Sequence, residues 1–222
     1  MHNTISIFED RKRELELYYS IMYDIDNGKP TIQTIDNSTF FKILKSNFIL
    51  MLYNLIEACT VSGILEIYEE LQQDGCSYNA VIDEIQNIWR SRQISNVYVQ
   101  TASKATYDNK VKEIISSITS NVPIVLTREE LKSFGGNLDD RRIMALCDKH
   151  KIRSGAKGDS QKLRIVRQKR NDLAHGDVSF SDCARDYTLS DLYEIKDAVV
   201  EFMQSIIDGM QKYYADHGYR IK

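Results

Sequence analysis

The chain has 222 residues, of which 42% are hydrophobic and 27% are charged, with two prolines and ten glycines. This composition is typical of one globular domain built from long regular elements. No run approaches the roughly 18 uncharged apolar residues of a membrane span, and no leader pattern is found, so we predict neither. The four cysteines are scattered without a CxxC pair, which argues against zinc and disulfides and favours a reduced, cytoplasmic protein.

The formal net charge of −3 hides a strong local asymmetry. Between Lys149 and Arg170 there are nine lysines or arginines and one acid, Asp159, which leaves a charge of −11 for the rest of the chain. A basic segment on an acidic body indicates a local anion site. The alternative is an ordinary solvated face with no ligand.

Two long helices are predicted in the first third of the chain. Residues 8–25 form an amphipathic pattern that ends at a turn containing Gly28. Capping residues at 36–38 begin a second helix, which reaches about Gln73 and is apolar nearly all round in its middle, as expected for the central helix of a bundle. On this apolar helix Glu57 requires a partner, either a buried cation or a ligand.

The stretch 77–155 is less uniform, and we interpret it as an insertion between core helices. A capping box at 127–130 predicts the start of a short helix. Weaker patterns predict three further helices, at 77–92, 103–118 and 139–150. Residues 123–126 are predicted to form a short strand or an extended linker.

Two more helices are predicted after the insertion. Asp159 or Ser160 caps a helix that runs to His175, and a second capping box at 188–191 opens a helix to about Tyr214. Together these patterns predict an all-α bundle in a single domain, with core helices at about 36–75 and 157–215. Three further histidines are expected at the surface: His2, His150 and His217.

The helix that ends at His175 carries the most informative pattern. Arg170 falls within its apolar stripe, which is formed by Leu163, Val166, Leu173 and Ala174. Imidazole exchanges protons near neutral pH, and a guanidinium binds phosphate with a planar fork. Such a pair suits RNA cleavage without a metal, because RNA supplies its own 2′-hydroxyl nucleophile. The alternative is structural, with Arg170 paired to Glu57 and His175 ending the helix.

The segment Arg170 to His175, with asparagine directly after the arginine, resembles the Arg-x4–6-His signature of the HEPN superfamily. The wider stretch 167–176, together with 179–180 and 186–188, is similar to a bacterial branch that is linked to phage defence. The resemblance implies an all-α toxin-like endoribonuclease that needs no metal or other cofactor. It also implies a homodimer whose two motif helices meet at a two-fold axis and form one composite site.

On this reading the catalytic residues are Arg170 and His175, and the supporting residues are Asn171 and Glu57. The expected substrate-binding residues are Arg164, Arg167, Lys169 and Arg185. RNA is the expected substrate, and an antitoxin or another defence protein is a possible partner. Asp177 stands where nucleotidyltransferase-controlled HEPN toxins carry a tyrosine, so control by modification of that tyrosine is not supported.

Two other functions fit the same residues. A non-catalytic HEPN-type module would use them only to bind RNA, a nucleotide or a partner protein. A purely structural bundle would need neither an anion nor an exposed imidazole.

Overall fold

The computed structural model describes residues 1–28, 37–97, 104–131, 137–156 and 160–221. These parts of the chain contain eight α-helices, two 3₁₀ turns and no strand beyond two isolated bridges. The elements, in order, are α1 (His2–Asp26), α2 (Asn37–Gln73), η1 (Tyr78–Ala80), α3 (Asp83–Val97), α4 (Lys104–Thr119), η2 (Arg128–Leu131), α5 (Asp140–His150), α6 (Gln161–His175), α7 (Phe180–Cys183) and α8 (Leu189–Ala215). The predicted all-α fold is confirmed.

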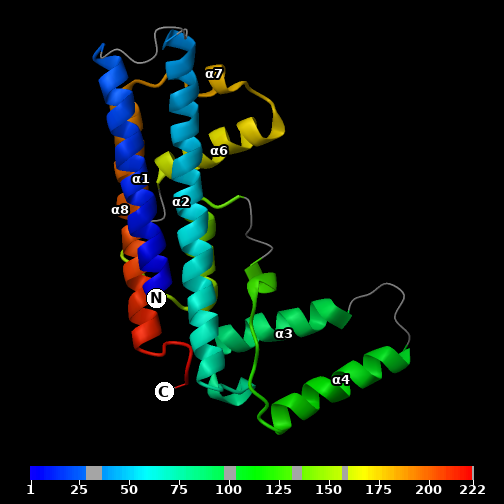
Figure 1. Ribbon diagram of the computed structural model, residues 1–222. Coiled ribbons are helices and arrows are strands. Elements are labelled where there is room, and N and C mark those ends of the chain that lie inside the picture. Colours follow the sequence, from blue (N-terminus) through cyan, green and yellow to red (C-terminus); the bar gives the residue numbers. More distant parts are fainter. Residues whose placement is uncertain (29–36, 98–103, 132–136, 157–159, 222) are drawn as a thin grey trace.

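Three long helices, α1, α2 and α8, lie side by side and form the main bundle (Figure 1). The middle of α2 is buried on several faces, by Phe48, Leu52, Ile56 and Ile64 among others, as its all-round apolar pattern predicted. The stripe of α8 is also buried, from Leu192 to Met210. Because α2 contacts α1, α6, α7 and α8, it positions every helix that surrounds the candidate site.

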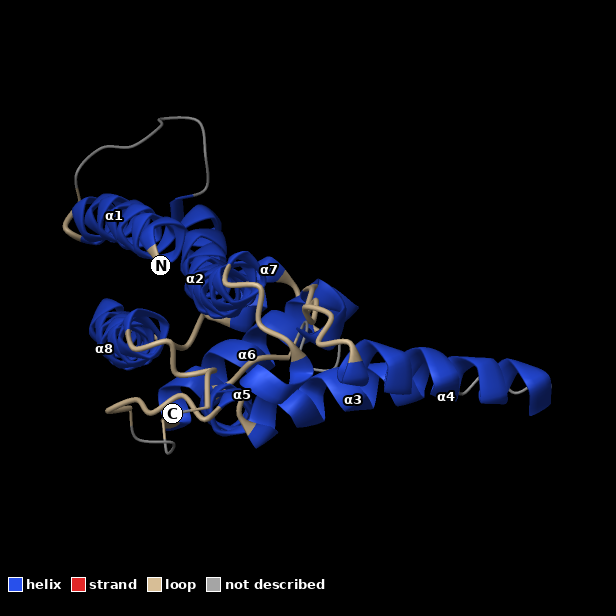
Figure 2. Cartoon of the chain, turned by 90° about the horizontal axis from the view of Figure 1, so that it is seen from below, coloured by secondary structure: helices blue, strands red, loops and turns tan. Residues whose placement is uncertain are grey.

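The remaining helices divide between the two ends of α2. α7 packs near the start of α2 (Figure 1), and α6 contacts α2, α7 and α8. α3 and α4 extend sideways from the bundle as an arm (Figure 2). α5 lies beside α6 in the same view and contacts α3, so it connects the arm to the helix that carries the motif.

Most element boundaries agree with the sequence patterns, and the differences have local causes. Of the two predicted capping boxes, that of Thr188 with Asp191 forms completely. The first, at Thr127, forms in part: the Glu130 carboxylate accepts the Thr127 N–H, but the Thr127 hydroxyl accepts the N–H of Glu129 instead of that of Glu130. The first of them opens only a 3₁₀ turn, and residues 123–126 are extended with a single bridge, from Pro123 to Ser77. The short helix α7 was not predicted, because four residues are too few to show a helical period.

By length and composition, residues 38–73 of α2 are apolar enough to cross a membrane. The sequence analysis predicted no such segment, because it looked for an uninterrupted run of uncharged apolar residues. In its most apolar window 56% of the residues are buried inside the protein. The central helix of a bundle satisfies the same criterion, so this feature alone does not assign a membrane segment.

His150 is buried at 1% exposure, so the expectation that it lies at the surface is wrong. Its Nδ1–H donates to the Leu146 carbonyl at 2.7 Å, and its Nε2 accepts the Tyr68 hydroxyl at 2.6 Å. A carbonyl can only accept, so Nδ1 carries the proton, and Nε2 of the neutral ring is the acceptor. Burial lowers the pKa of His150 to about 4, from its usual value near 6.5. The buried ring joins α5 to α2.

The neutral His150 makes the stability of the protein depend on pH. Below about pH 6.5 the unfolded chain takes up a proton that the folded protein refuses until about pH 4. The contribution is therefore complete above pH 6.5 and is lost as the pH falls towards 4, by up to about 1.4 kcal/mol per pH unit.

We expect the double variant Tyr68→Phe/His150→Leu, which leaves no hydroxyl without a partner, to flatten this slope between pH 7 and 5. Urea unfolding at several pH values measures the effect. An unchanged slope in the double variant would contradict the assignment.

Candidate functional site

The end of α6 is defined by a Schellman motif, which places His175 at the surface. Gly176 adopts a left-handed conformation with φ 75°. Its N–H donates to the Leu173 carbonyl at 3.2 Å, and the Asp177 N–H donates to the Asp172 carbonyl at 2.9 Å. The predicted role of Gly176 as the residue that ends the helix is confirmed. His175, the last helical residue, is exposed.

Arg170 lies within the same helix but is partly buried, and its guanidinium is held on two sides. Its Cζ lies 4.7 Å from the centroid of the Tyr53 ring of α2, a cation–π distance. Its Nη1 donates to the side-chain oxygen of Asn171 at 3.1 Å. Burial raises the pKa of Tyr53, so the phenol stays neutral beneath the cation. An arginine is therefore tolerated within the apolar stripe because an aromatic face covers it.

Arg170 and His175 do not share a face of α6. At about 100° per residue, five positions separate their side chains by about 140° around the helix axis. Asn171 is four residues before His175 and lies on its side of the helix, while its oxygen accepts from Arg170. Asn171 thus contacts the arginine from the side of the helix that carries the histidine.

One of the comparisons with known proteins gives a match. The model of the MAE_28990-like HEPN family matches residues 3–219. The chain belongs to this HEPN family. No match is found among curated proteins, and none among solved structures. The match spans the helices α1 to α8, so this HEPN family includes the stretch 77–155 that we interpreted as an insertion. Membership indicates an RNase-like or nucleotide-binding module.

Two of the expected substrate-binding arginines of this HEPN protein are paired with buried carboxylates at the start of α5. Arg164 contacts Asp140 at 2.9 Å, and Arg167 contacts Asp139 at 2.6 Å. Asp140 is fully buried and Asp139 is 3% exposed. Both arginines therefore hold α6 against α5, and part of the local positive charge that the sequence indicated is neutralised within the fold.

The other two expected substrate-binding residues lie nearer the surface. Lys169 is partly buried, with its Nζ 5.9 Å from the centroid of the Tyr187 ring. Arg185 is exposed and lies between Asp182 at 3.3 Å and Asp186 at 3.4 Å. Lys169 lies within α6, and Arg185 lies in the segment after α7. The two neighbouring acids reduce the net charge at Arg185.

Two residues near the start of α2, which the sequence analysis did not select, hold the segment after the motif. The buried Lys45 Nζ donates to the carbonyls of Arg185 and Tyr187, each at 2.7 Å. The Ser46 hydroxyl donates to the Phe180 carbonyl at 2.6 Å. Burial lowers the pKa of Lys45. The sequence offered one signal for Lys45: like Glu57, it is a charged residue next to an apolar stretch of helix, and such a residue requires a partner.

Glu57 lies one turn after Tyr53 on α2 and lines a groove of about 610 Å³ with Asn54, Arg128 and neighbouring residues. Among the residues that the structure describes, Glu57 takes part in no ion pair or hydrogen bond. The expected Arg170–Glu57 ion pair is therefore not formed, and Tyr53 contacts Arg170 instead. Partial exposure to the groove, rather than a cation, allows this carboxylate on an otherwise apolar helix.

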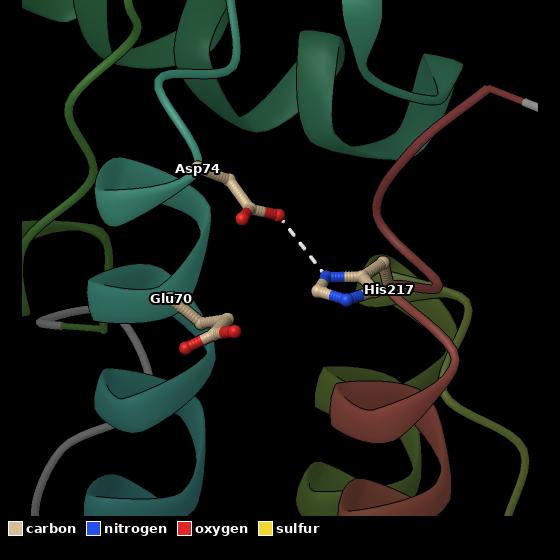
Figure 3. Close-up of side chains that lie close together, drawn as sticks. All are labelled: Glu70, Asp74 and His217. Atoms are coloured by element: carbon tan, nitrogen blue, oxygen red, sulfur yellow. Dashed lines mark ion pairs between the residues drawn. The ribbon is translucent and has the colours of Figure 1, made fainter.

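Glu70, Asp74 and His217 form a group with the spacing of metal ligands at the far end of the bundle (Figure 3). The Asp74 Oδ2 already accepts from the Arg220 Nη2 at 2.7 Å and from the Tyr219 hydroxyl at 2.5 Å, and it contacts the His217 Nδ1 at 3.0 Å. A guanidinium at this distance opposes a second cation. The group is better explained as a set of ion pairs and hydrogen bonds that joins the end of α2 to the residues after α8.

We expect Asp74→Asn to lower the free energy of unfolding by about 1 kcal/mol at pH 7, because the Tyr219 hydroxyl and Arg220 then lose a charged acceptor. The hydrogen bond from Tyr219, together with Arg220, lowers the pKa of Asp74 below 3.8, so this stabilisation is present above pH 3.8 and is lost at more acidic pH.

Urea unfolding checks this prediction, with Asp216→Asn, a nearby exposed aspartate, as the control. Added Zn²⁺ should leave the unfolding midpoint unchanged. A midpoint that rises with zinc would instead assign the group as a metal site.

Proposed function

We propose that this HEPN protein is a metal-independent endoribonuclease that acts as a homodimer. The observation that carries the proposal is the state of the motif: an oriented guanidinium at Arg170, which Asn171 contacts, and an exposed imidazole at His175, five residues later on α6. A structural bundle has no need to keep the imidazole exposed. Family membership supports the same reading at the level of an RNase-like module.

In the proposed reaction His175 takes the proton of a ribose 2′-hydroxyl. The 2′-oxygen then forms a bond to phosphorus, the bond from phosphorus to the 5′-oxygen breaks, and the leaving 5′-oxygen receives a proton. Arg170 stabilises the negative charge that develops on the phosphoryl oxygens. The products are one fragment with a 2′,3′-cyclic phosphate and one with a 5′-hydroxyl.

The geometry of α6 supports a site shared by two copies. The separation of about 140° between Arg170 and His175 makes it difficult for one helix to direct both groups at one phosphodiester. Two copies related by a two-fold axis would bring an arginine and a histidine together. Apolar side chains are exposed near this end of α6, at Ala174 and at Phe180, which is 41% exposed. Such residues suit an interface.

A non-catalytic module that binds RNA or a nucleotide is the second candidate, and the same cation–π-held arginine favours it. Both functions predict RNA affinity that falls with salt, since Arg170 and Lys169 would contact phosphates. Only the ribonuclease predicts RNA fragments that end in a 2′,3′-cyclic phosphate, so product analysis distinguishes the two functions. An antitoxin or another defence protein stays a predicted partner that these contacts do not identify.

We expect His175→Ala to reduce RNA cleavage by at least about a hundredfold, because the proton acceptor is lost. Helix content and the unfolding midpoint should not change, because the side chain is exposed. His2→Ala, which removes another exposed histidine, is the matched control. Gel analysis of labelled RNA in the presence of EDTA measures cleavage. Full activity in His175→Ala, or its loss with EDTA, would refute the mechanism.

The shared site makes a separate prediction. Arg170→Ala and His175→Ala should each be inactive alone, whereas a mixture that is allowed to exchange subunits should regain part of the activity. Recovery is expected because a mixed dimer keeps one arginine and one histidine at the common site. Sedimentation velocity reports whether the dimer forms. A monomeric protein, or a mixture no more active than its components, would contradict the shared site.

A further inference from the structure

Four consecutive residues, 137–140, run along the motif helix just before α5 begins. Each of them bonds to a different part of the site or of α6. Asn137 contacts Asn171, Leu138 contacts Tyr53, Asp139 contacts Arg167, and Asp140 contacts Arg164 together with the start of α6. The contacted positions of α6 lie three or four residues apart, which is one turn of the helix. The segment therefore follows one face of α6 along most of its length.

The contact of Asn137 has a defined direction. The Arg170 guanidinium can only donate, so the atom of Asn171 that faces it must be the side-chain oxygen, at 3.1 Å from Nη1. The amide nitrogen of Asn171 therefore faces Asn137 and donates to its Oδ1 at 2.7 Å. Asn137 must present an acceptor. A chain of two hydrogen bonds thus leads from Asn137 through Asn171 to the guanidinium.

Leu138 fixes the second support of Arg170. Its backbone N–H donates to the Tyr53 hydroxyl at 3.2 Å. The ring of the same tyrosine lies beneath the guanidinium, 4.7 Å from its Cζ. Two adjacent residues, Asn137 and Leu138, therefore hold two groups that contact Arg170, the asparagine beside it and the aromatic ring below it.

Asp139 and Asp140 attach this segment firmly to α6. Asp139 caps α5 by accepting the Arg142 N–H at 3.0 Å, and it also contacts Arg167. The Asp140 Oδ2 accepts both the Ser160 N–H and the Arg164 Nη1, each at 2.9 Å. Both carboxylates are buried, and leaving a buried charge without its partner is costly. The register between the segment and α6 is therefore strongly fixed.

We propose that the segment 137–140 is the positioning element of the site, with Asn137 as its principal positioning residue. The inference rests on the proposed ribonuclease function for its kinetic consequence. Asn137 holds the Asn171 amide, and through it the Arg170 guanidinium, in the orientation that meets a phosphate. Because α5 connects this segment to α3, the stretch 77–155 takes part in setting the geometry of the site.

Steady-state cleavage of one RNA by the full chain tests the proposal. Asn137→Leu and Asn137→Ala should lower kcat by about ten- to a hundredfold and change KM by less than about twofold, because the cation is misplaced rather than removed. Asn137→Asp keeps an acceptor oxygen and should retain most of the activity. Asn109→Leu, the same change at an exposed asparagine of α4, is the control.

A second measurement does not depend on cleavage. The Nε–H NMR signal of Arg170, assigned by its loss in Arg170→Lys, should be shifted and slow to exchange with water in the wild type and in Asn137→Asp. In Asn137→Leu it should move to the position of a mobile arginine. An unchanged signal in Asn137→Leu, or Asn137→Asp as impaired as Asn137→Leu, would overturn the positioning role. If the wild type cleaves no RNA, the proposed function is wrong. The NMR result would still decide whether Asn137 positions Arg170.

Discussion

The contact between the Arg170 guanidinium and the Tyr53 ring is the interaction on which the candidate site depends. Burying a cation in the apolar stripe of a helix costs free energy unless another group covers the charge. An aromatic ring covers the face of the guanidinium, while the N–H groups at the guanidinium edge still reach polar partners. Asn171 is such a partner. The arrangement keeps the guanidinium partly buried and oriented, beside a histidine that stays in water at the end of the same helix.

The helix α2 supplies the fixed surface for this contact and for others along its length. Near its start Lys45 and Ser46 hold the backbone after the motif, in its middle Tyr53 lies beneath Arg170, and Tyr68 bonds to the buried His150 of α5. These four side chains bond to specific later segments of the chain, and they help to decide how α5, α6 and α7 are placed around α2.

The basic run before the motif has two uses in the folded protein. Arg164 and Arg167 are paired with carboxylates at the start of α5, hold α6 in register and have part of their charge neutralised within the fold. Arg170 contacts the Tyr53 ring and the Asn171 amide, and in our proposal it contacts phosphate. Charge counting along the sequence cannot separate these uses, because it does not show which acids fold back onto the run.

The sequence alone determined the all-α class, the capping box of α8, the end of α6 at Gly176 and the Arg170–His175 motif, because helical period, caps and motif spacing are local properties. Only the tertiary structure decided the partners: Tyr53 rather than Glu57 for Arg170, buried carboxylates for Arg164 and Arg167, and a buried place for His150. Those contacts join residues that are far apart in the chain. They follow from how α5 and α6 pack on α2, which no local pattern records.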